Sequence, residues 1–397
     1  MANSTPPPRP TFYSRLTELL RQEFAAGITV GSGALLAVLW SFVSPTTYQS
    51  VLHGSFEINL LTRADLGSVY EATINGLMVI FFFVVGLELS REIRTGVLQD
   101  RRHAALPVVA AIGGMVASAA VFELIGRLFS NGQIERGWGV PMATDIAFTL
   151  GALALVGRRV PNGLRVFLLT LAIADDVFAV VVLALVSHHH AAPAWLGVAA
   201  LILVPVAWPG KRYPPVIYVV VLVLVWLCFV AAHVEPALCG AVVGICVPFG
   251  DSPTGDKLEH AIVPWSNGFV LPLFALGACG VVWDTLSTDT SVVELIGAVI
   301  VARIAGKALG ITGATALGRR LGLALPSDVT MPMVAASSIL CAIGFTVPLL
   351  FAGSVFGYGS VASSSITVGL LIASVLAALL GVVLLRRAID RAPLDSL

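Results

Sequence analysis

Long apolar runs, separated by short polar connections that are rich in Gly and Pro, follow one another along almost the whole chain. A helix that crosses a bilayer needs roughly 20 mostly apolar residues, and runs near that length recur throughout. We predict about twelve transmembrane helices, near residues 28–46, 72–90, 105–127, 139–157, 163–187, 194–208, 214–232, 234–249, 262–283, 292–317, 329–353 and 362–386. The pattern therefore predicts an all-α polytopic membrane protein.

The polar segments give the rest of the organisation. Residues 1–25 are predicted to be a cytoplasmic tail with an amphipathic segment, residues 26–388 a single transmembrane domain, and residues 389–397 a cytoplasmic C-terminal tail. Polar and apolar residues alternate from Gly54 to Leu60, which predicts a small extracytoplasmic β-hairpin. Nearly all Lys and Arg of the connections fall on the side of the N-terminus, and the opposite side has only Arg63, Arg127 and Arg136. This asymmetry predicts that both termini are cytoplasmic.

Composition narrows the class of protein further. Hydrophobic residues make up 57% of the chain and charged residues 12%, whereas soluble domains average about 25% charged residues. Lys+Arg and Asp+Glu each number 23, so the charge balance gives no reason to expect a nucleic-acid partner. The five cysteines lie in apolar runs without the spacing of metal ligands. We expect that the protein needs no cofactor and that it is not an enzyme.

Among the charged residues of the apolar runs, five stand out: Asp145, Asp175, Asp176, Arg303 and Lys307. A charged side chain at that depth costs about 2.5–3.5 kcal/mol on insertion scales, so such residues usually have a function. Successive helical residues point about 100° apart, so Asp175 and Asp176 cannot face the same point. Arg303 and Lys307 are four residues apart and share a face, where like charges repel. We therefore expect each of the two cations to have an acid nearby.

Two of the predicted helices carry interruptions. Pro141 lies in the fourth, and Gly344, Thr346 and Pro348 lie in the eleventh. Proline removes a helical hydrogen bond, and paired interrupted helices indicate a transporter's binding site. Two ordinary proline kinks are the alternative interpretation.

The buried carboxylates suggest a chemistry. Carboxylate oxygens bind a small hard cation or a proton, and burial together with a second carboxylate favours the protonated form. Competition of a cation and a proton for Asp175 and Asp176, with exposure alternating between the two sides of the membrane, is sufficient for exchange.

These residues resemble the NhaA family of bacterial Na⁺/H⁺ antiporters. The resemblance extends from the first helix to the last, and its motifs include Val85-Gly-Leu-Glu88, Ala143-Thr-Asp145, Ala172-Ile-Ala-Asp-Asp176, Gly306-Lys-Ala-Leu-Gly-Ile311 and Ile343-Gly-Phe-Thr346. It implies inverted repeats, with the fourth and eleventh helices discontinuous and crossing at mid-membrane. It also implies a bacterial inner-membrane protein that exchanges cytoplasmic Na⁺ or Li⁺ electrogenically for protons under pH control.

The resemblance also implies roles for individual residues. Asp176 matches the principal ion and proton carboxylate, Asp175 the acid that pairs with Lys307, and both would hold Na⁺. Asp145 and Thr144 match positions of charge compensation and ion contact at the helix break. A cluster associated with pH response is matched by Glu88, Glu92, Glu259 and His260; a solvated mixed-charge funnel is the alternative interpretation. The predicted hairpin resembles the family's homodimer contact.

Some positions depart from the family pattern. Asn75 stands where some members have an acid, and Glu235 and Val263 stand where His is expected. Because His is the usual switch near neutral pH, these departures leave the pH threshold open. Arg303 has no counterpart in the pattern. His188, His189 and His190 form a run that we interpret as solvated loop rather than as a metal site.

Two other functions fit parts of the sequence. An ion-coupled solute symporter would share the architecture, but it would need room for an organic substrate. An intramembrane aspartyl protease would use acids on different helices, such as Asp145 and Asp175, but its Gly-x-Gly-Asp signature is absent and Pro248-Phe-Gly-Asp251 is only a superficial match.

Overall fold

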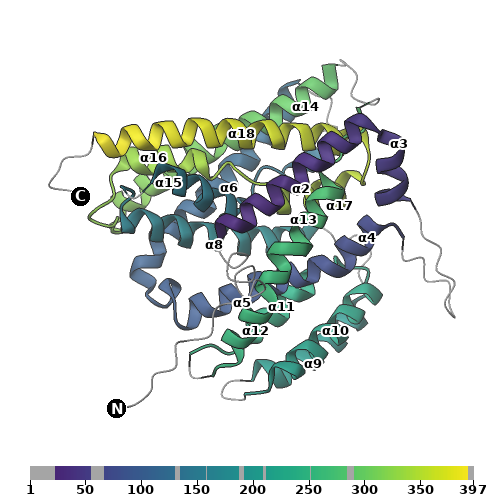
Figure 1. Ribbon diagram of the computed structural model, residues 1–397. Coiled ribbons are helices and arrows are strands. Elements are labelled where there is room, and N and C mark those ends of the chain that lie inside the picture. Colours follow the sequence, from purple (N-terminus) through teal and green to yellow (C-terminus); the bar gives the residue numbers. More distant parts are fainter. Residues whose placement is uncertain are drawn as a thin grey trace, which may run out of the picture.

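The computed structural model describes residues 23–54, 67–129, 135–157, 159–186, 192–208, 212–250, 252–283 and 290–391, and every regular element in these ranges is helical (Figure 1). Six helices are long and apolar enough to cross a membrane. The prediction of an all-α polytopic membrane protein is therefore confirmed, whereas the number of twelve spans stays a prediction. The core of the predicted hairpin, the three consecutive histidines, and residues 1–22 and 392–397 lie outside the described residues.

The α-helices follow the predicted apolar runs closely. They are α2 (Glu23–Val43), α3 (Pro45–Tyr48), α4 (Val69–Ala72), α5 (Met78–Arg94), α6 (Arg101–Phe129), α7 (Ile146–Val156), α8 (Asn162–Val186), α9 (Pro193–Ala207), α10 (Pro215–Ala231), α11 (Leu238–Cys246), α12 (Thr254–Trp265), α13 (Leu271–Ala278), α14 (Thr290–Val301), α15 (Lys307–Arg320), α16 (Met331–Leu340), α17 (Thr346–Phe356) and α18 (Val361–Asp390). Wider π turns at Thr73–Leu77, Ser266–Val270 and Ala302–Gly306 join α4 to α5, α12 to α13 and α14 to α15.

The helices pack around two hydrophobic clusters. The larger cluster includes buried residues of α6, α8, α16, α17 and α18, and the smaller one lies among α5, α9, α10, α11 and α12. In Figure 1, α18 runs along one edge of the molecule while α9 and α10 lie at the opposite edge. α5 and α11 contribute to both clusters and so connect the two parts of the bundle.

Glycines bring α6 and α15 into backbone contact. A Cβ atom on Gly310 would lie 2.3 Å from the carbonyl oxygen of Gly113, and one on Gly306 would lie 2.5 Å from the Cα of Ser118. Small residues allow membrane helices to approach this closely. The contact fixes the helix that carries Arg303 and Lys307.

Gly310→Ala is therefore expected to lower the free energy of unfolding of the purified protein by about 1–3 kcal/mol, the usual cost of overpacking. Gly313→Ala is the matched control on the same helix, because a Cβ there would have no neighbour within 4 Å. It is expected to stabilise slightly, since Ala has the higher helix propensity. Thermal unfolding in detergent measures both, and equal melting temperatures for the two variants would contradict the close contact.

Both interrupted runs depart from continuous helix. α16 ends at Leu340 and α17 begins at Thr346, with residues 341–345 in non-helical conformation between them. The fourth run was predicted to be helical from residue 139, but residues 138–145 form turns and extended chain and the helix begins only at Ile146. The apolar residues of this segment predicted that it lies inside the membrane. They did not predict which hydrogen bonds its backbone makes. The Asp145 amide donates to the carbonyl of Ile343 over 3.1 Å, so the two interruptions lie against each other.

Candidate functional site

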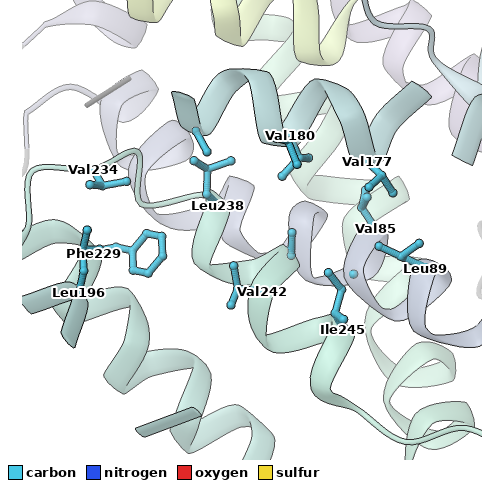
Figure 2. Close-up of a pocket in the computed structure, with 14 residues that line it drawn as sticks. Val85, Leu89, Val177, Val180, Leu196, Phe229, Val234, Leu238, Val242 and Ile245 are labelled. Atoms are coloured by element: carbon cyan, nitrogen blue, oxygen red, sulfur yellow. The ribbon is translucent and has the colours of Figure 1, made fainter. Parts of the chain in front are cut away.

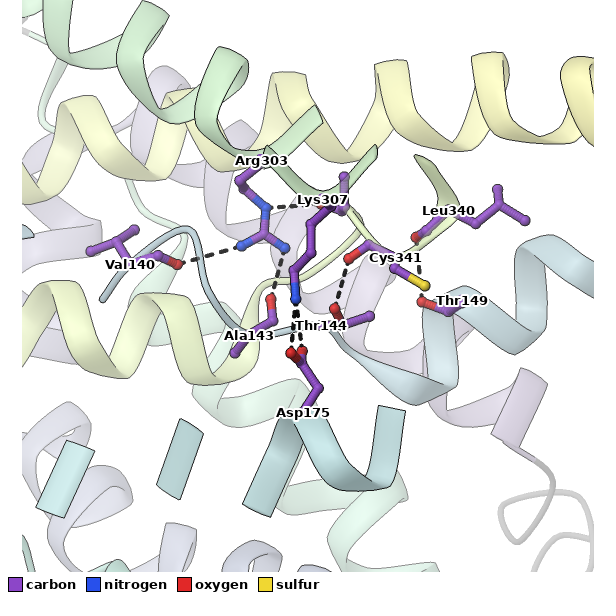
Figure 3. Close-up of polar contacts among 10 residues, drawn as sticks. Val140, Ala143, Thr144, Thr149, Asp175, Arg303, Lys307, Leu340 and Cys341 are labelled. Carbon is purple, nitrogen blue, oxygen red and sulfur yellow. Dashed lines mark hydrogen bonds and ion pairs between the residues drawn. The ribbon is translucent and has the colours of Figure 1, made fainter. Parts of the chain in front are cut away.

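A buried ion pair joins α15 to α8. The Lys307 Nζ lies 2.9 Å from Oδ1 and 3.0 Å from Oδ2 of Asp175, and both side chains are almost completely buried. Figure 3 shows the lysine reaching down from its helix to the aspartate. Because each charge compensates the other, neither is left isolated in the apolar interior.

Arg303, one turn before Lys307, is fully buried and binds backbone rather than an acid. Its Nε donates to the Ala342 carbonyl over 2.8 Å, its Nη2 to the Ala143 carbonyl over 3.0 Å, and its Nη1 to the Val140 carbonyl over 3.4 Å (Figure 3). We expected an acid near Arg303: Asp145 and Asp175 interact with it electrostatically, but its guanidinium makes no salt bridge to a carboxylate among the described residues. Three carbonyls of the two interruptions accept its hydrogen bonds instead.

Asp145 uses its carboxylate to cap α17. Its Oδ2 accepts hydrogen bonds from the amides of Phe345 over 2.6 Å and Thr346 over 3.1 Å, and its Oδ1 accepts one from the Thr346 hydroxyl. The amide end of a helix carries partial positive charge, so a carboxylate is stabilised there. In this conformation the Asp145 carboxylate therefore stabilises the start of α17.

The other polar side chains at the break also bind backbone. The Thr144 hydroxyl donates to the Cys341 carbonyl over 2.7 Å, and the Thr149 hydroxyl lies 3.4 Å from the Leu340 carbonyl (Figure 3). The Gly344 amide donates to the Ser374 hydroxyl over 3.3 Å. Backbone groups freed by the interruptions thus find partners inside the protein, as they must at membrane depth. Thr149 and Ser374 could not be recognised in the sequence as residues of the site, since a hydroxyl in an apolar run has no distinctive pattern.

Asp176 differs from the other acids of the site. It is only partly buried, and its carboxylate makes no hydrogen bond or ion pair with any residue that the structure describes. It interacts electrostatically with Asp175, Asp145, Glu88 and Lys307. A carboxylate in this position is available to a proton or a small cation.

An apolar cavity of about 430 Å³ lies between α5, α8 and α11 (Figure 2). Val177 and Val180, which follow Asp176 on α8, line it, as do Val85 and Leu89 on either side of Glu88 in α5. All of its lining residues are apolar, and neither Asp176 nor Glu88 is among them. The cavity therefore has no ligands for a cation.

The residues predicted to respond to pH lie in the C-terminal half of α5 and in the middle of α12. Glu259 forms an ion pair with Arg91, which joins these two helices. The Glu92 carboxylate accepts a hydrogen bond from the Val97 amide over 2.9 Å and so closes the turn after α5. Glu88 is half-buried and His260 is exposed. The cluster is thus partly a set of structural contacts, and its response to pH stays a prediction.

The site residues all fall inside one family match. A family model described as Na⁺/H⁺ antiporter 1 matches residues 17–385. The chain belongs to the Na⁺/H⁺ antiporter 1 family. The resemblance drawn from the sequence motifs is thereby confirmed.

Relatives of the Na⁺/H⁺ antiporter 1 family match the chain over nearly its whole length. The Na⁺/H⁺ antiporter NhaA of Serratia proteamaculans is 36% identical over 392 residues, which covers 95% of this chain and 98% of the relative. The protein of the same name from Aeromonas salmonicida is 35% identical over 388 residues, covering 96% and 97%. That from Cronobacter sakazakii is 37% identical over 399 residues, covering 96% and 99%.

Proposed function

We propose that this protein is an electrogenic Na⁺(Li⁺)/H⁺ antiporter that extrudes cytoplasmic Na⁺ in exchange for protons. The observation that carries the proposal is the Asp176 carboxylate, which has no hydrogen-bond or ion-pair partner among the described residues and adjoins the Asp175–Lys307 ion pair in the sequence. An open carboxylate beside a pair that can be broken offers both a site for an ion and a means of coupling that ion to protons. The family membership supports Na⁺ and H⁺ as the transported ions.

The proposed cycle follows from charge balance. When Na⁺ enters, it displaces the proton of Asp176, and Asp175 leaves Lys307 to complete the oxygen ligands of the cation. The lysine is then a buried ammonium without a partner, which favours loss of its proton. Two protons leave for one Na⁺ bound, so one net charge moves per cycle. On the other side of the membrane, protonation of Asp176 and Lys307 releases Na⁺ and restores the ion pair.

The same proposal includes the membrane topology, the response to pH and the oligomeric state. Twelve spans with two discontinuous helices crossing at mid-membrane would give the site alternating access, with both termini on the cytoplasmic side of the bacterial inner membrane. Glu88, Glu92, Glu259 and His260 would adjust activity to pH. The chain would form a homodimer through the extracytoplasmic hairpin.

A Na⁺-dependent dequenching assay tests this function. Everted vesicles that contain the full chain are acidified inside, and NaCl, LiCl or KCl is added across a series of pH values while a ΔpH-sensitive dye is followed. We expect dequenching with Na⁺ and Li⁺ and a rate that responds to the membrane potential. No dequenching with either ion, while control vesicles that contain an active antiporter respond, would refute the proposal.

A further inference from the structure

Arg303 is the charged group that the proposed cycle does not use. It is 0% exposed and lies in an apolar helix region, where a bare cation would be strongly destabilising. Its guanidinium makes no salt bridge to a carboxylate in the described part of the chain, and its partners are the three carbonyls of Val140, Ala143 and Ala342. Each of its three nitrogens thus donates to a carbonyl of the two interruptions.

These carbonyls are the groups that most need a donor. Ala342 is the second residue after α16, in the non-helical break, so its carbonyl has no helical hydrogen-bond partner. Val140 and Ala143 lie in the non-helical stretch before α7. A guanidinium has five donors in a planar fork, so one side chain satisfies three carbonyls from two segments that are about two hundred residues apart in the chain.

Asp145 is the opposite charge on the same structure. Arg303 binds the Ala342 carbonyl just beyond the C-terminal end of α16, whereas Asp145 binds the amides of Phe345 and Thr346 at the start of α17. The two charged groups also interact electrostatically with each other. The break between α16 and α17 therefore has a cation at its carbonyl end and an anion at its amide end.

The backbone leaves a place for this guanidinium. A Cβ atom on Gly344 would lie 2.4 Å from Nη2 of Arg303 and 2.9 Å from the Ala143 carbonyl oxygen. Only glycine permits the side chain to lie so close to the break at this position. Arg303 itself belongs to the π turn Ala302–Gly306, a wider turn of the kind often found at functional sites.

We propose that Arg303 is a positioning residue: a permanent cation that joins the two interruptions and holds Thr144 and Asp145 in place at the helix break. A guanidinium stays protonated in proteins, whereas a buried lysine loses its proton readily. The two cations on this helix therefore divide the work. Arg303 compensates the break in every state, and Lys307 remains free to lose its proton when Asp175 leaves it and to regain both when Na⁺ is released.

A double-mutant cycle of thermal stability tests the charge balance. Arg303→Met and Asp145→Asn, measured on the purified full chain in detergent, are each expected to lower the melting temperature by roughly 5–10 °C. The double variant is expected to lose clearly less than the sum, because no uncompensated charge remains. Arg319→Met is the matched control, since it removes an exposed cation from the last turn of α15 and should leave the melting temperature unchanged. Additive losses would overturn the proposed balance.

Transport kinetics separate positioning from a purely structural role, and this part rests on the proposed antiport function. Arg303→Met is expected to raise the apparent KM for Na⁺ about tenfold, equivalent to one charge-assisted hydrogen bond, with a smaller effect on the maximum rate. Arg303→Lys keeps the charge and should bring KM back to within about threefold of the wild type. Lower stability with unchanged KM in Arg303→Met would overturn the positioning role.

Gly344→Ala provides an independent variant if Arg303→Met does not fold. It displaces the guanidinium without removing its charge and should raise the KM for Na⁺ in the same direction, whereas a wild-type KM would overturn the proposal. A wild-type protein without Na⁺-dependent exchange would refute the proposed function alone, since the stability cycle still tests the pairing of Arg303 and Asp145.

Discussion

Asp176→Asn is expected to abolish Na⁺-driven proton release while the protein stays folded in the membrane. Asparagine has almost the same shape as aspartate but binds no proton and carries no charge for a cation. Asp176 is partly buried and has no hydrogen-bond or ion-pair partner among the described residues, so the substitution removes no structural contact. Exchange in everted vesicles should fall to the level of vesicles without the protein, and the melting temperature should stay close to that of the wild type.

Asp256→Asn is the control for the loss of a carboxylate. Asp256 lies exposed in the first turn of α12, away from the interruptions, and its replacement should leave exchange unchanged. If Asp176→Asn exchanged Na⁺ for protons at the wild-type rate, Asp176 would not be the transporting carboxylate. Loss of activity in both variants would point to a general defect in the vesicles.

The charged residues of the site could be found from the sequence because a charge in an apolar run implies a large free-energy cost of insertion into the membrane. Asp175, Asp176 and Lys307 stand in runs of apolar residues, and a charge at membrane depth requires a reason. Helix geometry separated the two aspartates, and the structure places them in different surroundings: Asp175 contacts Lys307, and Asp176 has no such partner among the residues described. The all-helical fold was predictable for the same reason, because apolar runs of bilayer length have few alternatives.

The partners of Arg303 and Asp145 could not be predicted in the same way. Both bind backbone groups, and any residue supplies a carbonyl or an amide, so these contacts leave no pattern in the sequence. The side chains that bind Ala342 and Phe345 come from elements far away in the chain, and only folding brings them together. Charge alone suggested an acid for Arg303, whereas the unpaired carbonyls of an interrupted helix are a second kind of negative partner.

The extent of the fourth helix shows another limit of the sequence pattern. Residues 139–145 are as apolar as a helix in a membrane, yet they form turns that bind Arg303 and the other interruption. Hydrophobicity reports where a segment lies and not which hydrogen bonds it makes. Pro141 marked the region without revealing how many residues would leave the helix.

Lys307→Met is expected to destabilise the protein by about 3–5 kcal/mol, because it leaves Asp175 as an uncompensated buried carboxylate. Any exchange that remains should move one proton fewer per Na⁺ and so become electroneutral in the proposed cycle. Thermal unfolding, together with transport rates measured with and without a clamped membrane potential, checks both parts.

The double variant Asp175→Asn, Lys307→Met separates the ion pair from the packing of its side chains. Since neither charge remains, it should recover most of the stability that Lys307→Met loses. It should transport no Na⁺ coupled to two protons, because the exchangeable pair is gone. Wild-type stability in Lys307→Met, or no recovery in the double variant, would mean that the buried pair does not balance the charge of this site, and the division of work between Lys307 and Arg303 would then have no basis.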